Sequence, residues 1–109
     1  MSGGRSRITG SCERDDIARV MRRLALPIRS CYQRRLWVNP DRQGEITARW
    51  LITIQGRVGS VSTTQDTLRD SAVTACIMRV LRRGLNFWTF PRLGGGSCTV
   101  QWPFEFRPM

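Results

Sequence analysis

The chain has 109 residues, 40% of them hydrophobic, and its 18 basic residues outnumber 8 acidic ones for a formal net charge of +10. This size and composition predict one domain with a modest core, and exclude disorder and a membrane span of roughly 20 apolar residues. All 18 basic residues are arginine, with no lysine or histidine. Because an imidazole base, a Schiff-base amine and histidine ligands are therefore missing, we expect a binding or structural module, not an enzyme, with no cofactor and no metal.

Residues 1–11 are rich in glycine and serine and show no apolar stretch typical of a signal peptide, so we expect a flexible lead-in before a single domain over 12–109. A helix is predicted from about Asp15 to about Leu36. Its apolar residues recur at spacings of three and four, namely Ile17, Val20, Met21, Leu24, Ile28 and Cys31. This stripe keeps its phase across Pro27, which favours a kink over two separate helices.

Two strands are predicted after a turn at Asn39-Pro40-Asp41. From Gly44 the apolar period changes to two, in Ile46, Ala48, Trp50, Ile52 and Ile54. Gln55-Gly56 provides a tight reversal, and the residues from Arg57 to about Thr64 are expected to form the hairpin partner. The valines of this second strand do not alternate cleanly, which indicates a bulge.

A second helix and a third strand follow. The helix is predicted from the apolar stripe Val73, Cys76, Ile77, Val80 and Leu81, with Asp70 or Thr67 as its N-cap and Gly84 as its C-terminal stop. The segment Leu85–Gly96 is aromatic and then glycine-rich, and is expected to be a loop. In the last strand, Cys98, Val100, Trp102, Phe104 and Phe106 alternate with polar residues and proline.

The order helix, strand, strand, helix, strand predicts an α+β fold with two helices packed on one face of a three-stranded antiparallel sheet. Pro103 cannot donate to a strand ladder, so we expect the third strand to be an outer strand. The aromatic residues of the strands share the inward phase and are expected in the core: Trp50, Trp102, Phe104 and Phe106.

The four cysteines contain no Cys-x-x-Cys pair, and a zinc site would need all four thiolates from scattered positions. Cys31 and Cys76 lie on the inward stripes of helices that should cover the same sheet face, which favours a disulfide over two reduced core cysteines. Cys12 and Cys98 are then left as a pair for which a second bridge stays open. An even cysteine count in a small domain fits an oxidising compartment.

Arginines gather on the two predicted helices, at Arg19, Arg22, Arg23, Arg29, Arg34 and Arg35 and at Arg79, Arg82 and Arg83. Solvated helix faces account for them, with binding to phosphate backbones or anionic lipid as the alternative. Trp88 and Phe90 lie in the predicted loop, where they either cover an end of the sheet or form contact aromatics. No base lies beside a serine or threonine, so no catalytic residue is assigned.

Eight ordered blocks carry a family resemblance: Asp16-Ile17, Ile28-Arg29-x-Cys31-Tyr32-x-Arg34, Gly44-x-Ile46, Gly56-Arg57-Val58, Val73-x-x-Cys76, Trp88-x-Phe90-Pro91, Gly94-Gly95-Gly96 and Trp102-Pro103-Phe104-x-Phe106. With them the chain resembles the AgmX/PglI C-terminal domain family, which is similar to the TonB C-terminal domain, from about Ser11 to Phe106. The chain departs from that pattern by the tryptophan of its Trp-Pro-Phe motif, by an insertion at Gly84-Leu85-Asn86, and by the additional Cys12 and Cys98.

The resemblance implies a periplasmic C-terminal domain of a longer protein that is anchored in the inner membrane of a Gram-negative cell envelope. Such proteins are associated with gliding motility and with TonB-like energy transduction. The resemblance also implies the Cys31–Cys76 pairing. TonB-like domains bind an extended partner segment at a sheet edge, and the strand implied here lies before Pro103, at Ser97, Cys98, Thr99, Val100 and Gln101.

We therefore expect a protein–protein interaction module for an outer-membrane or periplasmic segment, without direct membrane insertion of this domain. A homodimer formed by strand exchange stays open. The alternative is a basic nucleic-acid-binding module, for which the charge of +10 is the motive. No aromatic pair is predicted on an exposed sheet face, so we expect no specific nucleic acid.

Overall fold

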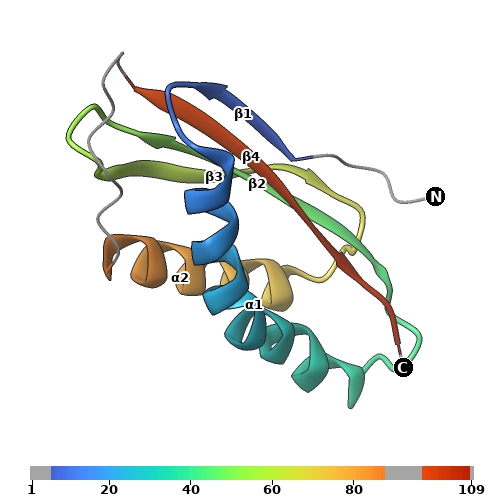
Figure 1. Ribbon diagram of the computed structural model, residues 1–109. Coiled ribbons are helices and arrows are strands. Elements are labelled where there is room, and N and C mark those ends of the chain that lie inside the picture. The colour runs from blue at the N-terminus through green and yellow to red at the C-terminus, as the bar shows by residue number, and fades with distance from the viewer. Residues whose placement is uncertain (1–5, 88–96, 109) are drawn as a thin grey trace.

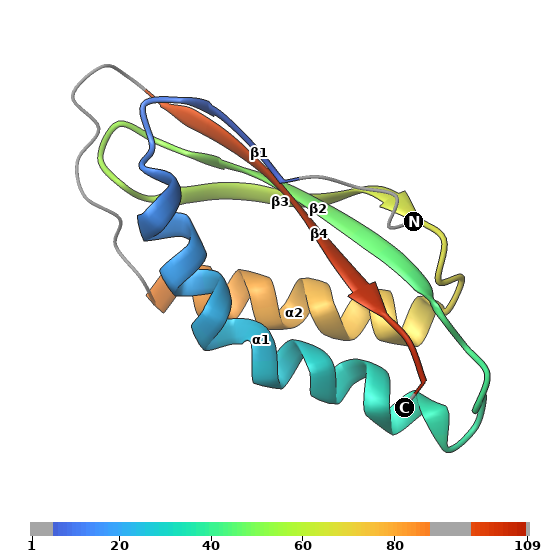
Figure 2. The same ribbon diagram turned by 45° about the vertical axis from the view of Figure 1, so that its right-hand side comes forward.

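The computed structural model describes residues 6–87 and 97–108, and no side chain in 85–87. The described elements are, in chain order, β1 (Arg7–Gly10), α1 (Arg14–Leu36), β2 (Gly44–Ile52), β3 (Val58–Asp66), α2 (Ser71–Phe87) and β4 (Cys98–Phe106). The strands form one antiparallel sheet in the order β1-β4-β2-β3, and both helices lie on the same face of it (Figures 1 and 2). The predicted α+β class and the two-layer arrangement are confirmed.

The helix α1 passes through Pro27 without a break, as the unbroken apolar stripe predicted. Figures 1 and 2 both show its axis changing direction part-way along. A proline inside a helix removes one backbone hydrogen bond and clashes with the preceding turn, which accounts for the bend. The helix buries the predicted stripe together with Tyr32, and so covers the sheet along its length.

The helix α2 begins at one of its two predicted N-caps but ends later than its sequence predicts. The Asp70 carboxylate accepts hydrogen bonds from the amides of Ala72 (3.1 Å) and Val73 (3.4 Å), so the N-cap is Asp70 and not Thr67. The predicted stop at Gly84 and the predicted start of the loop at Leu85 are wrong, because α2 continues to Phe87. A Cβ on Gly84 would lie 2.5 Å from a methyl carbon of Leu24, so this glycine serves close packing of α2 on α1.

The prediction of three strands is wrong, because a fourth strand, β1, lies within the expected lead-in. Arg7–Gly10 pairs with Gln101–Cys98 in antiparallel register. A four-residue segment with one apolar side chain, Ile8, carries no alternation that could reveal a strand. Gly10, with φ of +115°, makes the close approach to β4 possible, since a Cβ there would lie 2.5 Å from the carbonyl oxygen of Ser97.

The expected outer position of the last strand is also wrong for its first half. β4 pairs with β2 along its whole length, from Gly44↔Phe106 to Ile52↔Cys98, and with β1 along Cys98–Gln101. Within β4, and among the described residues, Trp102–Phe106 is the part that is paired on one side alone. Pro103 lies in that half, which is where a residue without an amide hydrogen is tolerated.

The core lies between the sheet and the helices, with Trp50, Ile46 and Ile52 of β2 fully buried at its centre. Phe106 is buried as predicted, whereas Trp102 and Phe104 are only half-buried. The register between β2 and β3 shifts twice, and the shift between Trp50 and Ile52 confirms the bulge predicted from the valine spacing.

Candidate functional site

The segment assigned as the partner-binding strand, Ser97–Gln101, has no free edge beyond Ser97. Cys98, Thr99, Val100 and Gln101 lie between β1 and β2 and pair with both. The disulfide between Cys12 and Cys98 ties the chain just after β1 to the beginning of β4, with the two Cα atoms 5.9 Å apart. An added strand cannot pair with these residues while β1 is in place.

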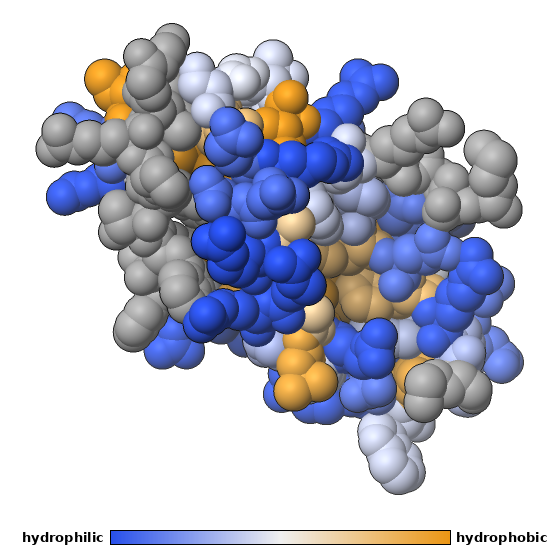
Figure 3. Space-filling view, viewed as in Figure 1, coloured by the Kyte–Doolittle hydropathy of each residue, from blue (hydrophilic) through white to orange (hydrophobic). Residues whose placement is uncertain are grey.

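Among the described residues, Trp102–Phe106 of β4 is paired with β2 alone, because β1 begins at Arg7, opposite Gln101, and this stretch is the open part of β4. A groove runs between this edge and α1, formed by two adjoining hollows of about 390 and 420 Å³. It is called the β4–α1 groove here. The apolar side chains and alanines that line it are Ala18, Met21, Ala25, Ile28, Tyr32, Leu36, Trp102, Phe104 and Phe106. Figure 3 shows the corresponding hydrophobic area between α1 and β4, framed by hydrophilic atoms.

Aromatic contacts hold both ends of the β4–α1 groove in place. At one end the Arg14 guanidinium lies 6.0 Å from the ring centroid of Trp102. At the other end the rings of Tyr32 and Phe106 lie 4.9 Å apart at their centroids. The Tyr32 hydroxyl donates to the backbone carbonyl of Arg42, and burial raises the pKa of this hydroxyl above its usual value, so it stays a neutral donor.

The rim of the groove is mainly positive. Arg22 and Arg29 are exposed there and form no ion pair with any described residue. Arg107 is paired with Glu105, the acidic residue on this rim. The groove therefore combines an apolar floor with unneutralised guanidinium groups at its edge, which suits an extended segment carrying apolar and acidic side chains.

The outer edge of β3 is the other long unpaired edge in the described part of the sheet. Its side chains are mostly exposed and polar, and only Val61 is buried. The residues that line the β4–α1 groove include none of β3. The β3 edge therefore offers a partner backbone hydrogen-bonding groups but few apolar side chains to contact.

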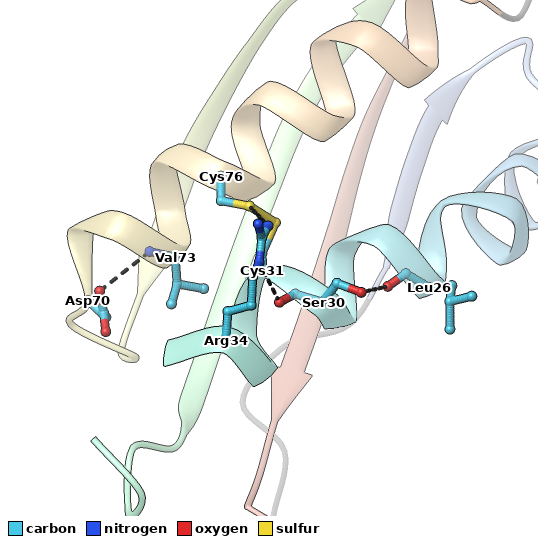
Figure 4. Close-up of a disulfide and its surroundings, with 7 residues drawn as sticks. All are labelled: Leu26, Ser30, Cys31, Arg34, Asp70, Val73 and Cys76. Carbon is cyan, nitrogen blue, oxygen red and sulfur yellow. Dashed lines mark hydrogen bonds between the residues drawn. A yellow bond between two sulfur atoms is a disulfide. The ribbon is translucent and has the colours of Figure 1, made fainter. Parts of the chain in front are cut away.

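The second disulfide joins the two helices. Cys31 of α1 and Cys76 of α2 are bonded, with Cα atoms 5.7 Å apart, and Figure 4 shows the bridge between the helices. The preferred Cys31–Cys76 pairing and the open Cys12–Cys98 pairing are both present, so all four cysteines are disulfide-bonded. The prediction of an oxidising compartment fits this arrangement.

An ion pair also links the helices near this disulfide. Arg35 donates from Nε to the Asp70 carboxylate at 3.1 Å, and the Asp70 side chain is almost fully buried. Burial by itself disfavours the charged carboxylate, but the hydrogen bonds from Arg35, Val73 and Ala72 and the Arg35 charge outweigh it, and the pKa of Asp70 lies below its usual value. Asp70 thus acts as a helix cap and as an anchor between α1 and α2.

The remaining predicted contact residues fall in two groups. Trp88 and Phe90 lie outside the described residues, so they are not placed. The other arginines of the two helices are exposed, as expected for solvated helix faces.

Neither described helix is both long and apolar enough to cross a membrane. The exposed Trp37, directly after α1, was not singled out by periodicity, because its side chain continues no buried stripe.

No protein-family model matches this chain, and comparisons with curated proteins and with solved structures found no significant match. The resemblance to the AgmX/PglI C-terminal domain therefore stays a prediction from the eight sequence blocks. The features of this chain that indicate a function are the β4–α1 groove and the surface charge.

Proposed function

We propose that the chain is a noncatalytic protein–protein interaction module that binds an extended segment of a partner protein by strand addition to β4. The observation that carries the proposal is the coincidence of an unpaired strand edge, Trp102–Phe106, with the apolar β4–α1 groove beside it. The edge supplies a few backbone hydrogen bonds, and the groove supplies pockets for alternate side chains.

Pro103 determines which backbone groups the open edge presents. Since proline has no amide hydrogen, its backbone is tolerated facing away from β2, toward the open side. Residues of the same phase face the same side, so the open edge presents the carbonyl of Pro103 and both the amide and the carbonyl of Glu105. A partner segment therefore gains few backbone hydrogen bonds and depends on filling the groove, which favours selective binding over indiscriminate edge pairing.

The cellular setting is part of the same proposal. Two disulfides support a domain that folds in an oxidising compartment. The resemblance to the AgmX/PglI and TonB C-terminal domains supports the periplasm, an inner-membrane-anchored protein, and a partner in the outer membrane or periplasm. In that setting the module would couple gliding-motility or energy-transducing machinery of the cell envelope to its partner.

Nucleic-acid binding is the competing function, because the charge of +10 attracts any polyanion. The described aromatic residues of β2 and β4, Trp50, Trp102, Phe104 and Phe106, pack toward the helices or line the groove. On the face of the sheet away from the helices, none of these described aromatic residues provides a platform on which single-stranded bases could stack. This arrangement favours the protein partner.

The test is an NMR titration of the ¹⁵N-labelled domain with extended peptides from periplasmic segments of outer-membrane proteins. We expect the Glu105 amide to shift most, because it faces the open edge, and the amides of Phe104 and Phe106 to shift less, because they bond to β2. Shifts confined to β3, or to the arginines of the helices, would contradict strand addition at β4.

A matched pair of variants tests the groove itself. Ala25→Gln places a longer neutral side chain in the β4–α1 groove, and we expect it to weaken peptide binding at least about tenfold, the equivalent of 1.4 kcal/mol. Ala75→Gln makes the same change on an exposed position of α2 away from the groove and should leave binding unchanged. Equal affinities for the two variants would place the binding site elsewhere.

A further inference from the structure

The outer surface of the helical layer is mainly positive, and its acidic residues Asp15 and Asp16 lie in the first turn of α1. The sequence from Arg19 to Val38 and from Ser71 to Phe87 contains nine arginines and no acidic residue. Arg35 is half-buried and forms an ion pair with Asp70, and the exposed Arg19 lies 3.5 Å from the Asp16 carboxylate. The eight arginines other than Arg35 are exposed and form what we call the basic helical face: Arg19, Arg22, Arg23, Arg29, Arg34, Arg79, Arg82 and Arg83. The two helices lie side by side on the sheet (Figure 2), and all eight arginine side chains are exposed.

Apolar side chains protrude among these arginines. Trp37 is 91% exposed, Leu26 is 74% exposed and Val38 is 64% exposed. Trp37 keeps helical backbone angles, and it lies about three helical turns after Leu26, so the helical period places both residues on the same side of α1. Over α1, Figure 3 shows isolated hydrophobic atoms surrounded by hydrophilic ones. Large side chains this exposed on a helix contribute nothing to the core and are available to an external partner.

A hollow of about 540 Å³ lies beside Trp37, where α1 meets α2. Arg34 and Trp37 line it from α1, and Val80 lines it from α2. The Arg34 guanidinium is held in place, because Nε donates to the Ser30 carbonyl and Nη2 to Cys76 Sγ, each at 3.3 Å. Figure 4 shows Arg34 lying against the disulfide that joins the two helices. A fixed guanidinium, an indole and an aliphatic side chain thus surround one space.

We propose that the basic helical face is a peripheral docking surface for an anionic phospholipid bilayer. Arginines contact lipid phosphates, and Trp37 and Leu26 enter the headgroup region, where an aromatic residue with one polar end is favoured. Arginines alone would suit any polyanion. The protruding apolar side chains favour a bilayer over the other polyanions. A nucleic-acid backbone offers them no apolar environment, and a protein partner would need a pocket shaped for each of them.

The test is cosedimentation of the purified domain with vesicles of phosphatidylglycerol and phosphatidylcholine, and with vesicles of phosphatidylcholine alone, at about 0.15 M salt. We expect binding to the anionic vesicles only. Arg82→Gln should lower the partition coefficient about fivefold, and Trp37→Ala should lower it about tenfold. Arg49→Gln and Leu51→Ala are the matched controls, because both residues are exposed on β2, away from the helices, and both variants should partition nearly as the parent does.

Tryptophan fluorescence gives a second measurement. Anionic vesicles should shift the emission to the blue in the parent domain but not in Trp37→Phe, and circular dichroism verifies that each variant is folded. Equal losses for Arg82→Gln and Arg49→Gln would overturn the proposal in favour of nonspecific charge attraction. Unchanged partitioning of Trp37→Ala, or no sedimentation with anionic vesicles, would overturn it as well.

Discussion

Removal of the disulfide between Cys12 and Cys98 should cost much stability and should release β1 specifically. The sequence separation across this bridge is 86 residues, and across the Cys31–Cys76 bridge it is 45. In the unfolded chain the inner bridge shortens the outer loop to about 42 residues, and the chain-entropy model then assigns about 4 kcal/mol to closing it. A domain of this size has about 5–15 kcal/mol of stability, so Cys12→Ala/Cys98→Ala should fold but be markedly destabilised.

The assay combines urea unfolding with hydrogen exchange. In Cys12→Ala/Cys98→Ala we expect the free energy of unfolding to fall by about 4 kcal/mol. The amides of β1 should exchange fast, because a four-residue edge strand is then held by its pairing with β4 and the packing of Ile8 alone. β2, which is paired on both sides, should stay protected.

The variant Cys31→Ala/Cys76→Ala is the matched control. The bridge that this variant lacks closes a loop of similar size in the unfolded chain. The variant should therefore lose a similar free energy of unfolding, about 3–4 kcal/mol, but its β1 amides should stay protected from exchange. A loss below about 1 kcal/mol for the Cys12→Ala/Cys98→Ala variant, or equal β1 exchange in both variants, would refute the idea that the Cys12–Cys98 bridge holds β1.

Three further substitutions test other contacts. Since the folded-state pKa of Asp70 lies below the usual 3.8, its stabilisation is complete above that pH and is lost as the pH falls through the folded-state value. Asp70→Asn should therefore cost about 2 kcal/mol at pH 7 and flatten the acid limb of a urea-unfolding series, and an unchanged acid limb would argue against the Arg35 contact. Gly84→Val should clash with Leu24 and cost about 2 kcal/mol, seen as a lower melting temperature, and a raised one would show that the helices can separate freely. Gly10→Ala puts a Cβ at positive φ against β4, and β1 amide exchange should accelerate, whereas unchanged exchange would show that the strand adapts.

Much of the candidate site could be predicted, but not its position along β4. The strand Cys98–Phe106 was predicted with its observed bounds, and so was its inward aromatic face. Partner binding was assigned to Ser97–Gln101 because Pro103 weakens the other half as a hydrogen-bonding edge. The structure pairs Cys98–Gln101 with β1, and Pro103 lies on the edge that stays open.

The sequence by itself determined the features that depend on near neighbours. Apolar residues that recur every three to four positions predicted α1, and apolar residues at every second position predicted β2 and β4. The inward phase of Cys31 and Cys76 on the two helices predicted that these cysteines are neighbours. The predicted end of α2 at Gly84 was wrong because the local sequence is the same in two cases. A glycine near a helix end can stop the helix, or it can accommodate the close approach of a side chain such as Leu24.

Tertiary structure alone decided the strand order, and with it the free edge. β1 has one apolar side chain in four residues and no local signal, and it is stabilised by pairing with residues about ninety positions away. Such pairing depends on backbone groups and on a disulfide, which leave no periodic trace in the sequence. The same non-local packing decides which exposed side chains lie together, so the β4–α1 groove and the basic helical face emerge only when the helices are placed on the sheet.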